Sequence, residues 1–305
     1  MEEKFSEIVK ILPVRIKGEL LHREELFFQA QEIRVRIGRK IHIITGKEDR
    51  EVLMKNTSSE ITAEDIREMT EFISGYSMYA CEDELRQGFI TLKGGHRVGI
   101  TGETVIENGQ VKTMKNIASF NIRISREFKG CADKLLQYAD GNLLIISPPR
   151  AGKTTLLRDL LRQVSNRPME NVGIVDERSE IAACYRGIPG NDVGERTDVL
   201  DCCPKAEGML MLLRSMSPTV IGVDELGRKE DIDAVLRVIN CGVKLIATIH
   251  GDNLSEVRKK EVFQDLFQDG IFRYYIVLEQ ERIKIYDRNF EEINNYQKNS
   301  EKGGD

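Results

Sequence analysis

The feature that most constrains the fold is a short apolar run that leads into a Gly-Lys-Thr triplet and then into a helical pattern. The run covers residues 143–147, and the triplet is Gly152, Lys153 and Thr154. Beyond it, apolar residues recur on one helical side, at Leu156, Leu157, Leu160, Leu161 and Val164. A strand, a turn and a helix in this order predict a phosphate-binding loop. Backbone N–H groups, the helix dipole and a lysine ammonium then converge on a polyphosphate.

We expect nine consecutive residues to bind ATP, with Asp224 completing the set: Ser147, Pro148, Pro149, Arg150, Ala151, Gly152, Lys153, Thr154 and Thr155. Ser147 occupies the position of the usual first glycine, and the two prolines after it have no N–H to donate. The phosphate cradle therefore depends mostly on Ala151 to Thr155. The hydroxyl of Thr154 is expected to bind the Mg²⁺ that accompanies ATP. For the triplet alone, a chance match at a strand–helix corner is the alternative.

A second apolar run, residues 220–223, ends in Asp224 and Glu225. Such a run reads as a buried strand of a parallel sheet whose carboxyl end opens into a ligand crevice. We expect Asp224 to hold Mg²⁺ through a water molecule and Glu225 to orient the water that attacks the γ-phosphate. Without the phosphate-binding loop upstream, a strand followed by a solvated acidic turn would be the simpler interpretation.

Two further apolar runs predict strands that end at the same edge. Residues 172–175 are followed by Asp176 and Glu177, and residues 244–249 are followed by His250. Glu177 is an alternative or additional group for positioning the water. Thr248 or His250 is a candidate sensor of the γ-phosphate, although a lone histidine at a strand end is more often structural.

Composition indicates a globular protein of about two domains. The 305 residues are 40% hydrophobic and 31% charged, and the net charge of −5 argues against a general nucleic-acid binder. No run approaches the roughly 18 apolar residues of a membrane span, and the acidic start does not predict a signal peptide. The six cysteines are scattered and suggest reduced thiols in a cytoplasm rather than a metal site.

The predicted order is a smaller α/β domain at 1–129, a P-loop ATPase domain at 130–288 and a polar tail at 289–305. The ATPase domain is expected to hold a RecA/AAA-like parallel sheet with helices on both faces, and the tail is expected to fray from Asn289. In the first domain, Thr62 to Asp65 predicts a capping box, and Gly94-Gly95 and Asn108-Gly109 predict hairpin turns. We also expect a linking helix over residues 130–141.

Several arginines lie on the expected polar faces of strands or in charged loops. Such arginines are usually just solvated, but in ring-forming ATPases a neighbouring subunit or domain supplies an arginine that stabilises transition-state charge. The two leading candidates are Arg97 and Arg123. Further candidates are Arg126, Arg196 and Arg214, the last of which is alternatively a buried structural ion pair.

Five blocks of sequence together resemble the stage III sporulation protein AA family. They begin at Gly94, Asp176, Arg196, Pro204 and Arg214, and read GGHRVG, DERSEI, RTDVL, PKAEG and RSMSP. The likeness extends from Glu32 to the closing pair of strands, and it includes the Ser-Pro-Pro at the head of the phosphate-binding loop. That family is in turn similar to the hexameric ATPases of type II and type IV secretion and of pilus machines.

The resemblance implies an ATPase that forms a homo-oligomeric ring, a hexamer, in the cytoplasm of the mother cell of an endospore-forming bacterium. It would bind membrane-embedded sporulation channel proteins without entering the membrane itself, and no nucleic-acid partner is implied. The acidic box of the secretion relatives would correspond to Asp176 and Glu177, with Glu180 as an optional third member, and their histidine box to His250. One departure is Asp224, because those motors often have glycine before the catalytic glutamate.

Two other functions stay open from the sequence. One is a nucleic-acid-stimulated AAA-type NTPase, such as a loader or remodeller, which would need a basic stripe with stacking aromatics. The chain contains no tryptophan and only 6% aromatic residues. The other is a nucleotide-gated scaffold that hydrolyses slowly.

Overall fold

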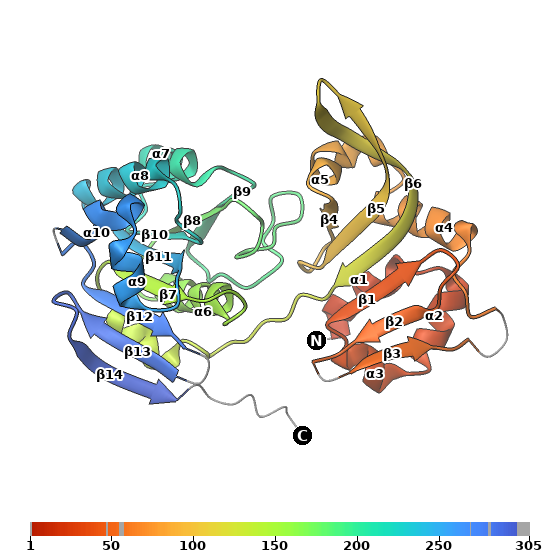
Figure 1. Cartoon of the computed structure of the whole chain (residues 1–305), viewed down its shortest axis with the longest axis horizontal. Coiled ribbons are helices and arrows are strands. Elements are labelled where there is room, and N and C mark those ends of the chain that lie inside the picture. Colours follow the sequence, from red (N-terminus) through yellow and green to blue (C-terminus); the bar gives the residue numbers. More distant parts are fainter. Residues whose placement is uncertain (1, 47, 55–57, 269, 280–281, 298–305) are drawn as a thin grey trace. The chain divides into compact units, whose positions relative to one another are not determined.

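The computed structural model describes residues 2–46, 48–54, 58–268, 270–279 and 282–297. They form two compact units, shown in Figure 1. The first consists of Met1–Arg126 together with Ala183–Gly190, and the second of Glu127–Ala182 together with Asn191–Asp305. The chain therefore leaves the second unit once and returns to it. The boundary that the sequence suggests between residues 129 and 130 stays a prediction.

The first unit contains an antiparallel sheet of six strands in the order β3-β2-β1-β6-β5-β4. Its elements are α1 (Glu2–Lys10), α2 (Val14–Leu21), α3 (Glu24–Gln29), β1 (Glu32–Arg36), β2 (Ile41–Ile44), β3 (Asp49–Val52), α4 (Ala63–Ile73), η1 (Met78–Cys81), α5 (Glu82–Arg86), β4 (Phe89–Thr91), β5 (Arg97–Glu107) and β6 (Gln110–Arg123).

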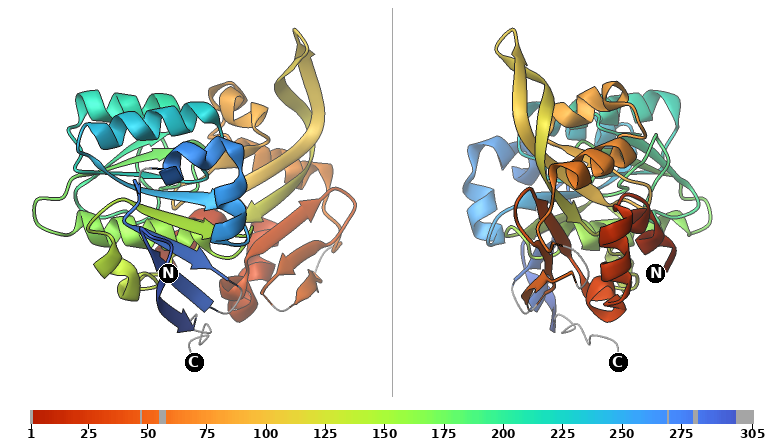
Figure 2. Two further views of the ribbon diagram at one scale, coloured as in Figure 1. Left: turned by 60° about the vertical axis from the view of Figure 1, so that its left-hand side comes forward. Right: turned by 90° about the vertical axis from the view of Figure 1, so that its right-hand side faces the viewer.

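Local sequence signals in this unit act as predicted. Thr62 caps α4, and the side chain of Asp65 accepts the Thr62 backbone N–H while Thr62 accepts that of Asp65, which completes the capping box. Asn108 and Gly109 both have positive φ, as a tight two-residue hairpin turn requires, and they join β5 to β6. The resulting long hairpin projects beyond the rest of its unit in both views of Figure 2.

The second unit contains eight strands in the order β14-β13-β12-β7-β11-β10-β8-β9. Its elements are η2 (Asp133–Tyr138), β7 (Leu143–Ser147), α6 (Lys153–Ser165), β8 (Val172–Asp176), β9 (Thr197–Asp201), α7 (Lys205–Ser215), β10 (Val220–Val223), α8 (Lys229–Asn240), β11 (Lys244–His250), α9 (Leu254–Lys259), η3 (Glu261–Phe263), α10 (Gln264–Gln268), β12 (Tyr274–Leu278), β13 (Arg282–Asp287) and β14 (Glu292–Gln297).

The six strands from β12 to β9 are parallel, and β13 and β14 add an antiparallel edge. Helices cover both faces of this sheet (Figure 1). A Cβ on Gly222 of β10 would lie 2.3 Å from Leu161 of α6, and one on Gly173 of β8 would lie 2.9 Å from Leu212 of α7. These two glycines therefore permit close packing of helices against the strands. The predicted α/β fold class is confirmed.

The linking helix predicted over residues 130–141 is confirmed in part: it is the shorter 3₁₀ helix η2, Asp133–Tyr138. Its buried residues Leu135 and Tyr138 are three positions apart, which suits 3.0 residues per turn. For residues 289–297 of the predicted tail, fraying is wrong, because β14 pairs with the otherwise open edge of β13. Residues 298–305 of that tail lie outside the described residues.

Among the described residues, no helix has both the length and the apolarity that a membrane-spanning helix needs.

Candidate active site

The strand, turn and helix that the sequence predicts for a phosphate-binding loop are present at the expected residues. Strand β7 is buried along its length, residues 148–152 turn without regular structure, and α6 starts at Lys153. Gly152 has a φ of +90°, which an L-residue adopts only under strain, so the turn requires glycine. The first N–H groups of α6 have no acceptor within the helix and are available to an anion.

Lys153 and Thr154 meet the end of β10. The Lys153 ammonium, only 5% exposed, contacts the Asp224 carboxylate and lies 3.2 Å from Glu225 Oε1. Thr154 Oγ1 donates to Asp224 Oδ2 at 2.5 Å. Strand β11 lies between β7 and β10, so the carboxyl ends of these parallel strands share one edge of the sheet. The structure therefore brings together the lysine, the threonine and the two acids that the sequence singled out.

The end of β11 supplies two further groups. The Thr248 hydroxyl donates to Asp224 Oδ1 and accepts the backbone N–H of Glu225 at 2.8 Å. His250 Nε2 lies 2.7 Å from Glu225 Oε1, and Arg178 Nη1 lies 2.9 Å from Glu225 Oε2. Glu225 has a φ of +57°, an uncommon conformation for a residue other than glycine. Its carboxylate is thus oriented by a lysine, a histidine and an arginine.

The environment keeps both acids ionised. Burial raises the pKa of Asp224, but the Lys153 charge and the hydrogen bonds from Lys153, Thr154 and Thr248 outweigh it and lower that pKa below the usual value. Burial also raises the pKa of Glu225, and Lys153 is the main cause of its net lowering.

A third carboxylate, which the sequence suggested only as an optional member of an acidic box, joins these two. Glu180, Asp224 and Glu225 each place a carboxylate oxygen so that the three atoms lie within 4.8 Å of one another. Carboxylate and hydroxyl oxygens are the ligands that Mg²⁺ prefers, so these residues with Thr154 fit that ion. Glu177 is arranged differently, because its carboxylate pairs with Lys205.

Arg97 and Arg123 belong to the first unit, where they are directly opposite each other on β5 and β6. The Arg97 guanidinium lies 4.2 Å from the centre of the Phe89 ring, and Arg123 Nε lies 3.9 Å from Glu32 Oε1.

The other two candidate arginines, Arg196 and Arg214, belong to the second unit, where they are exposed and donate to backbone carbonyls. The alternative of a buried ion pair for Arg214 is therefore wrong.

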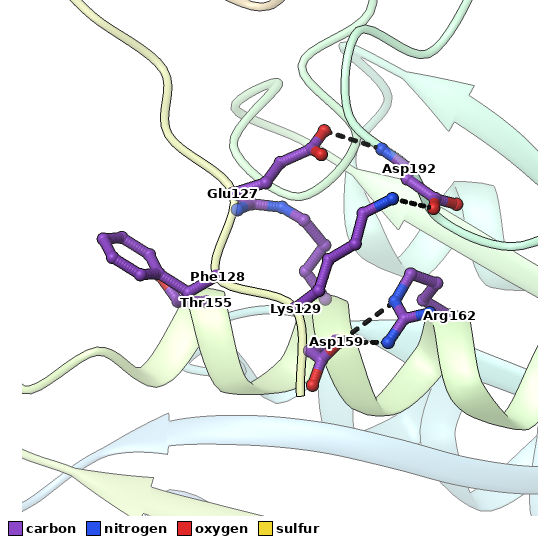
Figure 3. Close-up of a pocket in the computed structure, with 8 residues that line it drawn as sticks. Glu127, Phe128, Lys129, Thr155, Asp159, Arg162 and Asp192 are labelled. Atoms are coloured by element: carbon purple, nitrogen blue, oxygen red, sulfur yellow. Dashed lines mark hydrogen bonds and ion pairs between the residues drawn. The ribbon is translucent and has the colours of Figure 1, made fainter. Parts of the chain in front are cut away.

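The segment that enters the second unit passes over α6, as Figure 3 shows. Glu127 accepts the Asp192 N–H at 2.9 Å, and Lys129 pairs with the Asp192 carboxylate at 2.6 Å. Along α6, Asp159 pairs with Arg162 at 2.7 Å. The first two contacts join residues 127–129 to the loop around Asp192, and both segments line a pocket together with α6.

Comparison with known proteins gives consistent results. A model of the family described as Sporulation stage III, protein AA matches residues 2–291. The chain is 44% identical over 297 residues to Stage III sporulation protein AA of Bacillus subtilis (strain 168). The matched region covers 93% of this chain and 95% of that protein.

Among solved structures, the chain is similar to the ATPase DotB of Legionella pneumophila, with a TM-score of 0.60, 16% identity and coverage of 95% of this chain and 82% of that chain. It is also similar to the pilus retraction motor PilT with bound ADP, with a TM-score of 0.59, 14% identity and coverage of 84% and 76%. At these identities, the likeness establishes only that this chain shares its fold with the two proteins.

Proposed function

The chain belongs to the Sporulation stage III, protein AA family, and from that premise we propose that it is a magnesium-dependent ATP hydrolase. The observation that carries this proposal is the meeting of Lys153 and Thr154 at the start of α6 with Asp224 and Glu225 at the end of β10. A cationic phosphate ligand and two ionised acids at one edge of a parallel sheet are what phosphoryl transfer to water requires.

In this proposal, residues 147–155 hold the phosphates, with Lys153 exchanging its carboxylate partners for phosphate oxygens. Thr154 would hold Mg²⁺ directly and Asp224 would hold it through water. A bound Mg²⁺ would supply positive charge against the phosphates. Glu225 orients the attacking water and accepts its proton, while Thr248 and His250 hold Asp224 and Glu225 in place.

Between the two candidates for the water, the contacts favour Glu225 over Glu177. Glu225 belongs to the carboxylate group with Asp224, whereas Glu177 neutralises Lys205. In the proposal Lys153 leaves Glu225 for the phosphate oxygens, which frees that carboxylate for the water, whereas nothing in the proposal displaces Lys205 from Glu177.

The proposal is tested by measuring phosphate release from ATP by the purified full-length chain. We expect steady turnover with Mg²⁺ and its loss on addition of EDTA, restored by excess Mg²⁺. Tight ATP binding with turnover at the level of buffer would instead indicate a nucleotide-gated scaffold. Failure to bind ATP would refute the proposal altogether.

We further propose that the active form is a hexameric ring that energises a membrane-embedded sporulation channel from the mother-cell cytoplasm, with Arg97 or Arg123 completing the site of a neighbouring subunit. The variant of that arginine, Arg97→Ala or Arg123→Ala, and Lys153→Ala should then each be inactive alone, and mixing the two should partly restore turnover. A mixture with no activity above that of the separate variants would contradict action between subunits.

A further inference from the structure

The carboxylate of Glu180 is carried by irregular backbone. It joins Asp224 and Glu225, yet residues 177–184 belong to no helix or strand. Ser179 and Ala183, on either side of Glu180, have φ values of +52° and +49°, which few non-glycine residues adopt. A side chain on such a segment keeps a fixed position only if other parts of the fold hold its peptide groups.

Asp176 holds this segment from one side. Asp176 is the last residue of β8, and it is only 2% exposed. Its Oδ1 accepts the N–H of Glu180 at 2.7 Å, and its Oδ2 accepts the N–H of Ile181 at 2.9 Å and of Ala182 at 2.8 Å. Three consecutive N–H groups therefore converge on one buried carboxylate.

Arg158 holds the same segment from the other side. This residue lies on α6, one turn beyond Thr154. Its Nη2 donates to the carbonyl of Glu180 at 2.6 Å and its Nε donates to the carbonyl of Ile181 at 2.5 Å. The planar guanidinium suits two neighbouring acceptors in a way that a lysine ammonium does not.

These bonds fall on the same peptide groups. In the peptide between Glu180 and Ile181, the carbonyl binds Arg158 and the N–H binds Asp176; the peptide between Ile181 and Ala182 is held in the same way. Each of these two peptide groups thus has the partly buried Arg158 cation at its carbonyl and the buried Asp176 carboxylate at its N–H, which is the favourable arrangement for the peptide dipole. Asn191 adds a bond of 3.1 Å to the Ile181 carbonyl.

We propose that Arg158 and Asp176 act as a buried clamp that positions the Glu180 carboxylate beside Asp224 and Glu225, so that the helix of the phosphate-binding loop also fixes a carboxylate for the divalent ion. The two are positioning residues, because their contacts reach the backbone of the segment. The functional part of this inference depends on the proposed ATPase activity. The geometric part does not, and the two parts are tested separately.

The geometric part is tested by amide hydrogen exchange of the full-length chain without nucleotide or metal. In Arg158→Lys, exchange of the amides of Glu180, Ile181 and Ala182 should accelerate by about fivefold or more, as expected for the loss of one charged hydrogen bond. The matched control is Arg162→Lys, one turn along α6, whose guanidinium pairs with Asp159. Strand β10 should keep its protection in both, which verifies folding. Unchanged exchange at residues 180–182 in Arg158→Lys would overturn the clamp.

A second variant tests the other side of the clamp. Asp176→Asn keeps one acceptor oxygen but points an amide NH₂ at backbone N–H groups, so exchange in the same segment should again accelerate. If Arg158→Lys proves unstable, this variant carries the test, and normal protection of residues 180–182 in it would likewise overturn the proposal.

The functional part is tested by titrating Mg²⁺ at fixed ATP. The half-saturating Mg²⁺ concentration should rise by about 10–100-fold in Arg158→Lys, the range seen when residues that orient metal ligands are replaced. Binding of a fluorescent ATP analogue in EDTA should be unchanged.

Glu180→Gln should show the same rise in the half-saturating Mg²⁺ concentration, and the double variant should show no larger rise than Glu180→Gln alone. Additive losses would show that Arg158 does not act through Glu180. Absence of turnover in the unmodified chain would count against the ATPase proposal and leave the exchange result to decide the clamp.

Discussion

Replacing Glu225 with glutamine is expected to lower ATP turnover by about 10²–10⁴-fold while ATP still binds. Glutamine keeps the shape of the side chain and the left-handed backbone, but its amide cannot take a proton from the attacking water. The remaining contacts to Mg²⁺ and to the phosphates are unaffected, so the affinity for ATP should change little. Phosphate release measures the first quantity, and equilibrium binding of labelled ATP in the presence of Mg²⁺ measures the second.

The matched comparison is Glu177→Gln. Because the Glu177 carboxylate pairs with Lys205, this variant should lose much less activity, and part of the loss should come from the unpaired lysine. A fully active Glu225→Gln beside an inactive Glu177→Gln would assign the water to Glu177 instead.

Replacing Lys153 with methionine is expected to weaken ATP binding by about 10–100-fold, the equivalent of one or two hydrogen bonds to a charged group. Methionine preserves the apolar stem of the side chain but removes the ammonium that would bind the phosphates. Calorimetric titration with ATP and Mg²⁺ measures the change. The control is Lys244→Met, which removes a lysine paired with Glu170 at the opposite end of β11 and should bind ATP normally. Equal affinity in Lys153→Met and the unmodified chain would disprove the role of this lysine.

The same substitution should also destabilise the fold in a way that depends on pH. With Lys153 present, the pKa of Asp224 lies below its usual value, so the ionised carboxylate is compatible with the folded state. Without it, burial would raise that pKa above the unfolded value, and an unpaired charge would remain. The free energy of unfolding should therefore fall by about 3 kcal/mol at neutral pH. The loss should shrink toward pH ~4, because the raised pKa lets Asp224 of the variant become protonated there and removes its unpaired charge. Urea unfolding at the two pH values provides the measurement.

Part of the fold and much of the candidate site could be predicted because their sequence signals are local or follow from sheet geometry. Gly152 marks a turn that only glycine enters without strain, and Asn108-Gly109 and Thr62 to Asp65 act within a few residues. The approach of Lys153 to Asp224 follows from two parallel strands that end at one edge. None of these predictions required knowledge of how distant loops fold.

The parts that the sequence did not predict depend on the path of the loop after β8. Glu180 faces Asp224 only because Ser179 and Ala183 adopt positive φ, and no glycine or asparagine signals this at either position. Arg158 is not among the residues that the sequence singles out, because its role depends on contacts with the carbonyls of residues 180 and 181. Such contacts join segments whose meeting has no local sequence signal.

The excursion of Ala183–Gly190 into the first unit has a practical consequence for expressing the two units separately. A fragment that starts at Glu127 would still carry these residues, with exposed Ile188 among them, but without the rest of the unit to which they belong. The ends of the excursion are adjacent, since the Asn191 N–H donates to the Ala182 carbonyl at 3.0 Å. The Gly190 N–H also donates to the Ala183 carbonyl, at 3.2 Å. A truncated protein should therefore replace residues 184–189 with a short turn, which would close the loop and keep the Ala183 backbone beside Glu180.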